Sequence, residues 1–322
     1  MPRASIIVPS YNSAATLPAT LASLLAQTAK DFEIVVVDDG STDSTPDLLQ
    51  RITDPRLRIV RQANRGLAGA RNSGVHAARG TVVGFCDADD LWHPQKLDRH
   101  LEHLAARPRI GVSYSGSSLI DAKGRATGHA QRPRLKRVDA THVFLRNPIG
   151  NGSAPVFRRS ALDAISYLPK GGDTRPWVFD ETFRQSEDIE CWLRLALTTG
   201  WGIEGVPGLL TLYRVNPRGL SANLERQLAS WEAMVRKLTP LDPSFFQAHT
   251  AAARAYQLRY LARRAVSALD ADAAWSYARR ALASSLAPLR DEPLKTAVTM
   301  AAALALRSGS VEPLRRCSGL FR

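Results

Sequence analysis

Short runs rich in Val and Ile alternate with amphipathic helical segments along the first third of the chain. The strand-like runs are Ser5 to Pro9, Glu33 to Asp38, Leu57 to Arg61 and Thr81 to Asp87. Turn residues bound each run, and continuous apolar runs of this kind are typical of parallel strands covered on both faces. The alternation predicts an α/β domain with a mostly parallel central sheet flanked by helices.

Four helices are predicted between and after these strands. The first carries leucines at helical spacing, and Ser13 precedes them as a candidate cap. The second opens at Thr45 followed by Pro46, an N-cap with proline at the first helical position. The third runs from about Leu67 to Ala78. The fourth starts near Pro94, and we expect His93 to cap it and not to bind a metal.

Length and composition allow a large folded core. The chain has 322 residues, of which 44% are hydrophobic, and its three cysteines lie far apart with no disulfide or zinc spacing. The N-terminus lacks the core of a signal peptide, and the apolar stretch from Ala297 to Leu306 is too short to span a membrane. We therefore expect a cytoplasmic protein, peripheral on the inner face of the plasma membrane at most.

The chain carries 43 Lys and Arg against 30 Asp and Glu, a net charge of +13. This excess of positive charge favours an anionic partner. Charge alone does not decide whether that partner is nucleic acid, a phospholipid surface or a phosphorylated substrate.

Polar residues follow three of the predicted strands. The sequences are PSYN from Pro9, DDGS from Asp38 and DADD from Asp87. Ligands of such sheets bind at the carboxyl ends of the strands, so the three ends predict one common site. A single acid there is often a helix cap or a turn residue, which remains an alternative for Asp38 and Asp39 and for Asp90.

The segment CDADD offers chemistry suited to a hard cation. Two carboxylates separated by one residue, Asp87 and Asp89, favour Mg²⁺ or Mn²⁺, which take their other ligands from water and substrate phosphates. Between the acid clusters, NRGLAGARNSG supplies glycines and the charged fork of Arg71 next to the proposed phosphate site. It lacks the GxGxxG spacing of a dinucleotide loop, and the chain has no P-loop.

Six ordered motifs resemble those of family 2 glycosyltransferases, which are inverting enzymes with the GT-A fold. They are SIIVPSYN, VVVDDGSTDST, NRGLAGARNSG, GFCDADDLWHPQKL, FDETFRQSEDIECWLRLALTTG and LYRVN. The resemblance spans roughly Ser5 to Ser221. It implies transfer of one sugar from a nucleoside-diphosphate sugar, with a uridine donor expected, to a hydroxyl acceptor.

The resemblance also assigns residues to the donor. It implies that Pro9 and Tyr11 line the base pocket, and that Asp39 and Arg71 hold the base region. An ionised Asp39 can accept a hydrogen bond from a uracil-type imide. Asp87 and Asp89 would meet the ribose and the metal-bound diphosphate, with Asp89 as the direct ligand of Mg²⁺ or Mn²⁺.

An inverting transfer needs a base that deprotonates the acceptor hydroxyl. The segment QSEDIECWLRLA begins a predicted helix that Ser186 can cap, and acids in its first turn also suit the helix dipole. In the resembled family this ED pair supplies the base, so we expect Asp188 as base. The expected acceptor contacts are Glu187, Trp192 and Arg214. The QxxRW motif of processive synthases is absent, which favours the addition of a single sugar.

A basic segment separates the two acid groups. From Lys123 to Arg146 it contains seven basic residues and one acid, Asp139. Most such runs are solvated loops. The hypothesis here is that this one recognises a lipid diphosphate or an anionic membrane surface.

The remaining third of the chain reads as alanine-rich helices. We predict a GT-A domain at 1–222, with a nucleotide-binding half at about 1–115 and an acceptor half at about 116–222, and a helical region at 223–322. Membrane contact, oligomerisation and acceptor binding are open roles for that region. Synthesis of bacterial cell-surface polysaccharide, lipopolysaccharide or glycolipid is the expected setting.

Two other classes of function compete with an enzyme. The first is a sugar-nucleotide-binding or scaffold protein without catalysis, which the retained acids disfavour. The second is nucleic-acid binding, which calls for stacking aromatics among the basic residues. The basic segment has only Phe144, so we expect no nucleic-acid partner.

Overall fold

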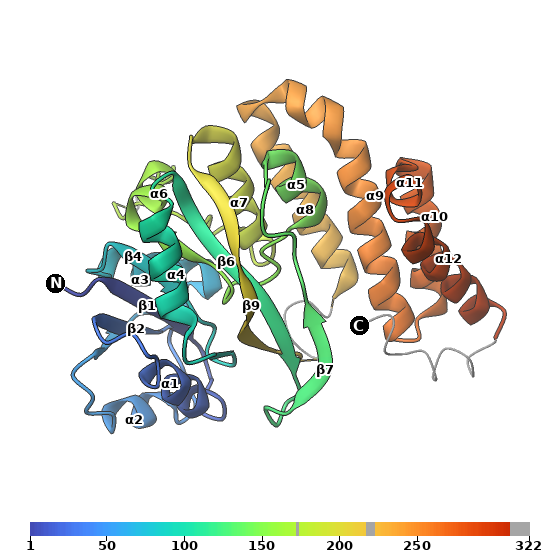
Figure 1. Cartoon of the computed structure of the whole chain (residues 1–322). Coiled ribbons are helices and arrows are strands. Elements are labelled where there is room, and N and C mark those ends of the chain that lie inside the picture. Colours follow the sequence, from blue (N-terminus) through green and yellow to red (C-terminus); the bar gives the residue numbers. More distant parts are fainter. Residues whose placement is uncertain (172–173, 217–222, 310–322) are drawn as a thin grey trace. The chain divides into compact units, whose positions relative to one another are not determined.

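The computed structural model describes residues 1–171, 174–216 and 223–309 (Figure 1). The chain divides into two compact units. The first comprises Met1–Val143 and the described part of 147–217, and the second comprises Phe144–Arg146 and the described part of 218–322.

The first unit is built on one mixed sheet. Within the described residues its strands are β1 (Ala4–Ser10), β2 (Phe32–Asp38), β3 (Leu57–Arg61), β4 (Val82–Phe85), β5 (Leu91–Trp92), β6 (Ile110–Ile120), β7 (Ala126–Gln131), β8 (Val156–Arg158) and β9 (Gly202–Arg214). They lie in the order β3-β2-β1-β4-β8-β6-β9-β5, and β7 pairs with β6 at the side.

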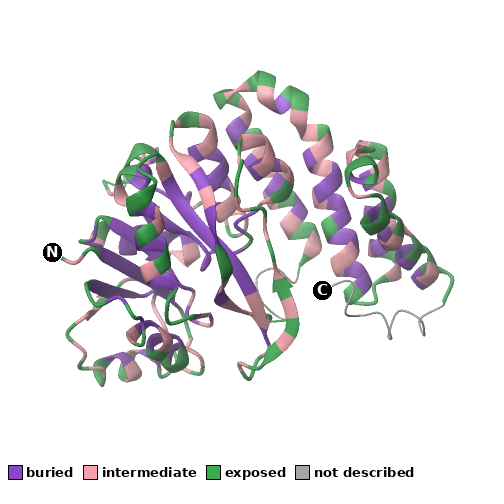
Figure 2. Cartoon of the chain, in the orientation of Figure 1, coloured by how far each residue is buried: buried purple, intermediate pink, exposed green. Residues whose placement is uncertain are grey.

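The four strands β3, β2, β1 and β4 are parallel, as predicted from their apolar runs. The register pairs Ser10 with Asp38 and Asp38 with Arg61, so the carboxyl ends of these neighbouring strands lie at one edge of the sheet. Every residue of β1 and β2 is buried (Figure 2). This burial explains why both strands are apolar throughout and not only at alternate positions.

Helices α1 (Leu17–Leu25), α2 (Thr45–Gln50) and α3 (Gly66–Ala77) connect these strands, and α4 (Lys96–Ala106) leads from β5 to β6. The leucines of α1 and α4 share a core cluster with Ile6 and Val8 of β1. Gly74 of α3 approaches the opposite side of β1, because a Cβ on Gly74 would lie 2.2 Å from Ile7 Cγ2. Alternate residues of β1 therefore face different helices, and the sheet is covered on both sides.

The N-cap residues of three helices differ from the predicted ones by one to three positions. Ser44 and not Thr45 is the N-cap of α2, and Gln95 and not His93 is the N-cap of α4. The carbonyl of His93 accepts from Lys96 N–H in the turn before α4, which moves the helix start. Likewise Thr16 is the N-cap of α1, while Ser13 contributes its carbonyl to the N–H groups of Thr16 and Leu17.

The rest of the first unit contains α5 (Ala140–Arg146, whose last three residues group with the second unit), α6 (Arg159–Ala164) and α7 (Glu187–Thr198). The second unit holds α8 (Leu224–Leu238), a 3-10 turn (Thr239–Leu241), α9 (Pro243–Ser267), α10 (Ala271–Ser284), α11 (Ala287–Asp291) and α12 (Pro293–Arg307).

Aromatic contacts explain the grouping of 144–146 with the second unit. The Phe144 ring stacks on Trp231 at 5.9 Å between centroids and meets Phe246 edge-on at 5.2 Å. Within the described residues, no helix has the length and apolarity needed to cross a membrane.

Candidate functional site

The loops that follow β1 and β2 are bonded to each other. The side-chain carbonyl of Asn12 accepts from the backbone N–H of Thr42 at 2.8 Å and of Asp43 at 3.3 Å. Asn12 N–H donates to Ser41 Oγ at 3.0 Å, and Ser13 N–H donates to Thr45 Oγ1 at 3.0 Å. Two of the predicted strand-end motifs therefore form one surface. Sequence analysis had not assigned Asn12 a role, although an Asn at a strand end is a common turn former.

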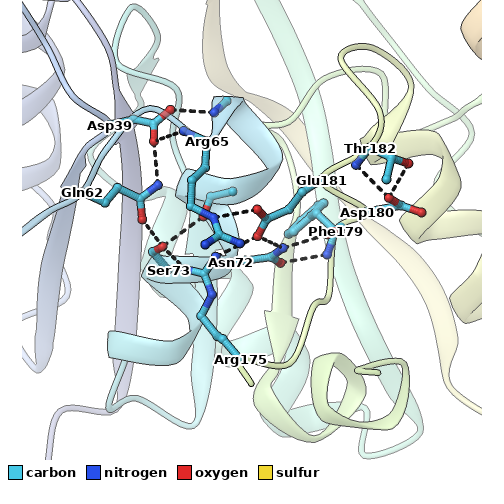
Figure 3. Close-up of polar contacts among 12 residues, drawn as sticks. Asp39, Gln62, Arg65, Asn72, Ser73, Arg175, Phe179, Asp180, Glu181 and Thr182 are labelled. Atoms are coloured by element: carbon cyan, nitrogen blue, oxygen red, sulfur yellow. Dashed lines mark hydrogen bonds and ion pairs between the residues drawn. The ribbon is translucent and has the colours of Figure 1, made fainter. Parts of the chain in front are cut away.

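Asp39 lies at the centre of this edge and is 2% exposed. Its Oδ1 accepts from Gln62 Nε2 at 2.6 Å and from Arg65 N–H at 2.9 Å, and its Oδ2 accepts from Gly66 N–H at 2.8 Å (Figure 3). Gly66 has φ +79°, a conformation that favours glycine. An ionised carboxylate has about four lone-pair positions, so Oδ2 retains one for a further donor.

A second network, which sequence reasoning missed, holds the segment before α7 against α3. Asn72 accepts from Val178 N–H and Phe179 N–H, and it donates to Glu181 Oε1 at 3.0 Å. Arg65 Nε and Arg175 Nη2 each donate to Glu181 at 2.8 Å (Figure 3). In the sequence, FDETF contributes only to the family resemblance, and nothing in its spacing indicates that Glu181 meets Arg65 at the start of α3 as well as Arg175 of its own segment.

The DADD sequence forms a tight turn after β4. Asp90 N–H donates to the carbonyl of Asp87 at 3.0 Å, and Asp87 N–H donates to Ser153 Oγ at 2.9 Å. Arg214 fixes the turn from the other side, because its N–H donates to Asp90 Oδ1 at 2.8 Å and its Nε donates to the carbonyl of Asp89 at 2.7 Å. Arg214 therefore positions the acidic turn, and its expected contact with the acceptor stays a prediction.

Two acids of this turn, Asp89 and Asp90, have raised pKa values. Burial, together with the negative charge of Asp87, raises the pKa of Asp89 to about 6. Burial and the charge of Asp89 raise the pKa of Asp90 well above its usual range, and its Oδ2 has no hydrogen-bond partner among the described residues. Asp90 therefore acts as a buried structural acid, in line with the turn-residue alternative.

Arg71 joins the acidic turn to α7. It is 2% exposed, and its Nη2 donates to Asp87 Oδ1 at 2.9 Å while its Nη1 donates to Glu187 Oε1 at 2.8 Å. Burial lowers the pKa of Arg71, but the charges of Asp87, Glu187 and Asp188 outweigh that effect and raise it overall. The guanidinium thus contacts two protein carboxylates, and its role beside the base stays a prediction.

Glu187 and Asp188 open α7. Burial and the neighbouring Asp188 raise the pKa of Glu187 to about 7, and burial also raises the pKa of Asp188. Asp188 keeps part of its surface exposed, and its Oδ1 accepts from Ile189 N–H at 2.7 Å. Ser186 is the N-cap residue by position, but its hydroxyl makes no capping hydrogen bond, contrary to expectation.

The other residues that we expected to contact a ligand, Trp192, Tyr11 and Pro9, differ in how far they are exposed. Trp192 is 1% exposed and stacks on Phe157 at 5.2 Å between ring centroids, so its burial argues against an acceptor contact. Tyr11 is 53% exposed beside the strand ends, where its ring is free to cover a ligand, whereas Pro9 is buried inside β1.

A divalent cation would find a partial donor set at this edge. No group of three or more His, Cys, Asp or Glu side chains able to hold a metal occurs among the described residues. Asp87 is engaged by Arg71, but within the described residues no hydrogen bond joins the Asp89 carboxylate to another residue's side chain. Burial and the charge of Asp87, which a cation would offset, raise the pKa of Asp89. One such carboxylate suits Mg²⁺ or Mn²⁺ when substrate phosphates and water complete the shell.

The mixed sheet, with its four parallel strands and acidic edge, is that of an α/β protein of the GT-A class. Residues 5–166 match the model of Glycosyl transferase family 2. The chain belongs to this family, which confirms the sequence-based resemblance.

Curated relatives extend the match beyond that region. TuaG of Bacillus subtilis, a putative teichuronic acid biosynthesis glycosyltransferase, is 39% identical over 69% of this chain and 82% of its own. WfaP of Escherichia coli, a UDP-Glc:alpha-D-GlcNAc-diphosphoundecaprenol beta-1,3-glucosyltransferase, is 30% identical over 70% of this chain and 82% of its own. An uncharacterized glycosyltransferase of Nostoc, alr2836, is 37% identical over 50% of this chain and 52% of its own.

Solved structures confirm the GT-A fold with a helical C-terminal region. The mannosyltransferase PcManGT of Pyrobaculum calidifontis, in complex with GDP-Man and Mn²⁺, is 25% identical with a TM-score of 0.60, covering 99% of this chain and 84% of its own. Residues 1–349 of TarS from S. aureus, in complex with UDP-GlcNAc, are 18% identical with a TM-score of 0.61, covering 95% and 92%.

Proposed function

We propose that this protein transfers a single sugar from a nucleoside-diphosphate sugar, with UDP-sugar as donor, to a hydroxyl group with inversion at the anomeric carbon. The observation that carries the proposal is the contact of one guanidinium, Arg71, with both Asp87 and Glu187. This contact brings the acidic turn after β4 next to the start of α7. Residues suited to holding a diphosphate and residues suited to activating an acceptor therefore meet in one place.

The donor base is expected at the joined loops after β1 and β2. Asp39 has one acceptor position left on Oδ2, which matches the single N–H of a uracil imide. The exposed ring of Tyr11 stands next to it in the same pair of loops and would stack on the base. The protein donors on Asp39 hold its carboxylate in a fixed orientation toward the ligand.

Asp89 is the proposed metal ligand, with Asp87 beside it. When bound, a divalent cation would supply positive charge that stabilises the leaving diphosphate. The local charges favour this arrangement, because the carboxylates of the turn would otherwise repel a diphosphate. Arg214 keeps Asp89 in place through its bond to the Asp89 carbonyl.

Asp188 is the proposed base. Its raised pKa makes its carboxylate a better proton acceptor than an exposed aspartate, and its partial exposure leaves it open to an acceptor hydroxyl. Glu187 is held by Arg71 next to it and would orient Asp188 or the acceptor. No covalent enzyme intermediate is required.

The acceptor class follows from the relatives and not from the site. WfaP acts on a diphosphoundecaprenol-linked sugar and TuaG is assigned to teichuronic acid biosynthesis, by their names. We propose a lipid-linked saccharide acceptor in bacterial cell-surface polysaccharide synthesis, which places the reaction at a membrane surface.

Calorimetric titration tests the donor half of the proposal. UDP, dTDP and GDP are each titrated into the protein with and without Mn²⁺. We expect metal-dependent binding of UDP that Asp89→Ala abolishes and that Asp163→Ala, which removes an exposed aspartate on α6, leaves unchanged. Preference for GDP would correct the donor, and absence of binding to all three nucleotides would refute the donor site.

The Asp188→Asn variant tests the base. It should bind UDP as the wild type does while kcat for transfer falls by about 10² to 10⁴. The configuration of the product, read by NMR, should be opposite to that of the donor. A retained configuration, or transfer by Asp188→Asn at the wild-type rate, would exclude this assignment.

A further inference from the structure

The segment after β7 is pinned to the sheet by its backbone. The carbonyl of Arg134 accepts from the hydroxyl of Tyr114, and the carbonyl of Leu135 accepts from Gly205 N–H at 2.7 Å. Val138 then forms a bridge with Ile203. The backbone of this segment is therefore fixed by β6 and β9, although β7 lies off the main path of the sheet.

Exposure alternates along this segment as it does along a strand. Arg132, Arg134 and Lys136 are exposed, while Pro133 and Leu135 are partly buried. Arg132, Arg134 and Lys136, the basic strip, therefore place three exposed cations within five residues, the last of them at a bend of the chain.

None of these three side chains has an ion pair with an acid in the part of the chain that the structure describes. Other cations of the same segment differ, since Arg125 pairs with Asp121 at 2.8 Å and Arg146 pairs with Glu292 at 2.9 Å. Neighbouring cations of the basic strip are two residues apart, which is a backbone span of at most about 7 Å. This span is shorter than the screening distance of about 8 Å at physiological salt, so like charges at these positions repel one another. An anionic partner would relieve this repulsion.

We propose that the basic strip is the contact of the protein with the anionic phospholipid surface of a membrane. This inference rests on the proposed function in one respect, namely that a lipid-linked acceptor lies at such a surface. The shape of the strip favours a surface over one small anion. Its cations are spread along an exposed segment, whereas a diphosphate site needs donors that converge on a point.

The chemistry of the strip also separates a membrane from nucleic acid. Single-stranded nucleic acids are bound by aromatic side chains interleaved with cations. The residues from Gln131 to Val138 include no aromatic residue. Cations also protect edge strands from pairing with other chains, and that role would require no lipid binding. Vesicle binding discriminates between these functions.

The experiment measures co-sedimentation of the full chain with vesicles of phosphatidylcholine alone or with about a third phosphatidylglycerol, near physiological salt. A basic residue near an anionic bilayer strengthens binding about fivefold. Replacing Arg132, Arg134 and Lys136 together by Gln should therefore weaken binding to the anionic vesicles on the order of 100-fold. A matched control replaces Arg3, Arg51 and Arg109, three exposed arginines in separate segments of the same unit, by Gln.

We expect the wild type and the control to bind anionic vesicles and the strip variant to lose that binding. UDP titration of the strip variant should equal that of the wild type, which shows that it is folded and separates failure of this inference from failure of the donor site. Wild-type affinity in the strip variant, or an equal loss in the control, would overturn the inference. Displacement of the protein by millimolar pyrophosphate would reassign the strip to a single anion, and tighter binding to DNA that the strip variant loses would reassign it to nucleic acid.

Discussion

Replacing Arg71 by Met should destabilise the first unit in a pH-dependent way. Met retains much of the length of the side chain but leaves the carboxylates of Asp87 and Glu187 without their cation. Both carboxylates accept from Arg71 within 3 Å, at 2.9 and 2.8 Å. Removing one partner of a buried ion pair costs about 3 to 5 kcal/mol, because the remaining charge stays buried.

The structure narrows the expected loss of stability in Arg71→Met and shows how that loss depends on pH. The Asp87 side chain is 24% exposed and can be hydrated, whereas that of Glu187 is 8% exposed, so we expect about 3 kcal/mol at pH 8. The pKa of Glu187 is raised to about 7 from its ordinary value of 4.5. An acid whose pKa is raised by folding stabilises the folded state when it is protonated, and this stabilisation is lost as pH rises through 7. At pH 5.5 Glu187 is protonated, so the loss of Arg71 should cost less.

Thermal melting followed by circular dichroism measures the effect. For a unit of about 200 residues, 3 kcal/mol corresponds to a decrease of about 6 to 12 °C in Tm. Arg71→Lys, which keeps the charge but not the two-pronged contact, should fall between the wild type and Arg71→Met. Adding Glu187→Gln to Arg71→Met should recover part of the loss. The two buried ion pairs of Arg71, with Asp87 and with Glu187, are called the charge bridge. A melting temperature within about 2 °C of the wild type at pH 8, or an equal decrease at both pH values, would refute the stabilising role of this charge bridge.

Three further substitutions test neighbouring parts of the structure. Gly152→Ala should displace the charge bridge and lower both transfer activity and Tm, because its Cβ would lie 2.1 Å from Arg71 Nη2, whereas Gly200→Ala, with no heavy atom within 4 Å, should do neither. Glu187→Gln should leave the acid limb of the kcat/KM profile in place, because Glu187, with a pKa of about 7, is already uncharged below that pH; loss of the limb would assign it to Glu187 and argue against Asp188 as base. Burial lowers the pKa of Lys96 to about 7 from 10.5, so the unfolded chain binds more protons between these values and wild-type stability should rise with pH there. Lys96→Met should remove this rise in Tm between pH 7 and 10, and a rise of equal size in the variant would contradict the shift.

The sheet and its acidic edge were predictable because local patterns determine them. An unbroken apolar run such as that of β2 is compatible with burial on both faces, and parallel strands place their carboxyl ends together. The acids Asp39, Asp87 and Asp89 follow directly from where those strands stop. Helix starts were less predictable, since backbone carbonyls such as that of His93 took part in the turns that the sequence had assigned to side-chain caps.

The contacts of individual charged side chains were not predictable. Arg71 lies between two acid groups in the sequence and was expected beside the donor base, but its partners come from 16 and 116 residues away. Trp192 follows the acids of α7 and was expected near the acceptor, yet the helical rotation turns it toward Phe157 in the core. Charge and spacing identify candidate groups, and only the packing of α3 against the sheet decides which of them meet.

The charge bridge also explains how α7 begins where it does. Ser186 has φ +64°, a left-handed conformation that costs a residue other than glycine about 1 kcal/mol, and its hydroxyl makes no capping bond. The acids of the first turn interact favourably with the helix dipole, but they would repel Asp87 if no cation stood between them. Arg71 supplies that cation and the Asn72 and Glu181 network holds the preceding segment. The distance between the proposed base and the proposed diphosphate site is therefore fixed by residues of α3, so substitutions on α3 should alter catalysis although they touch neither substrate.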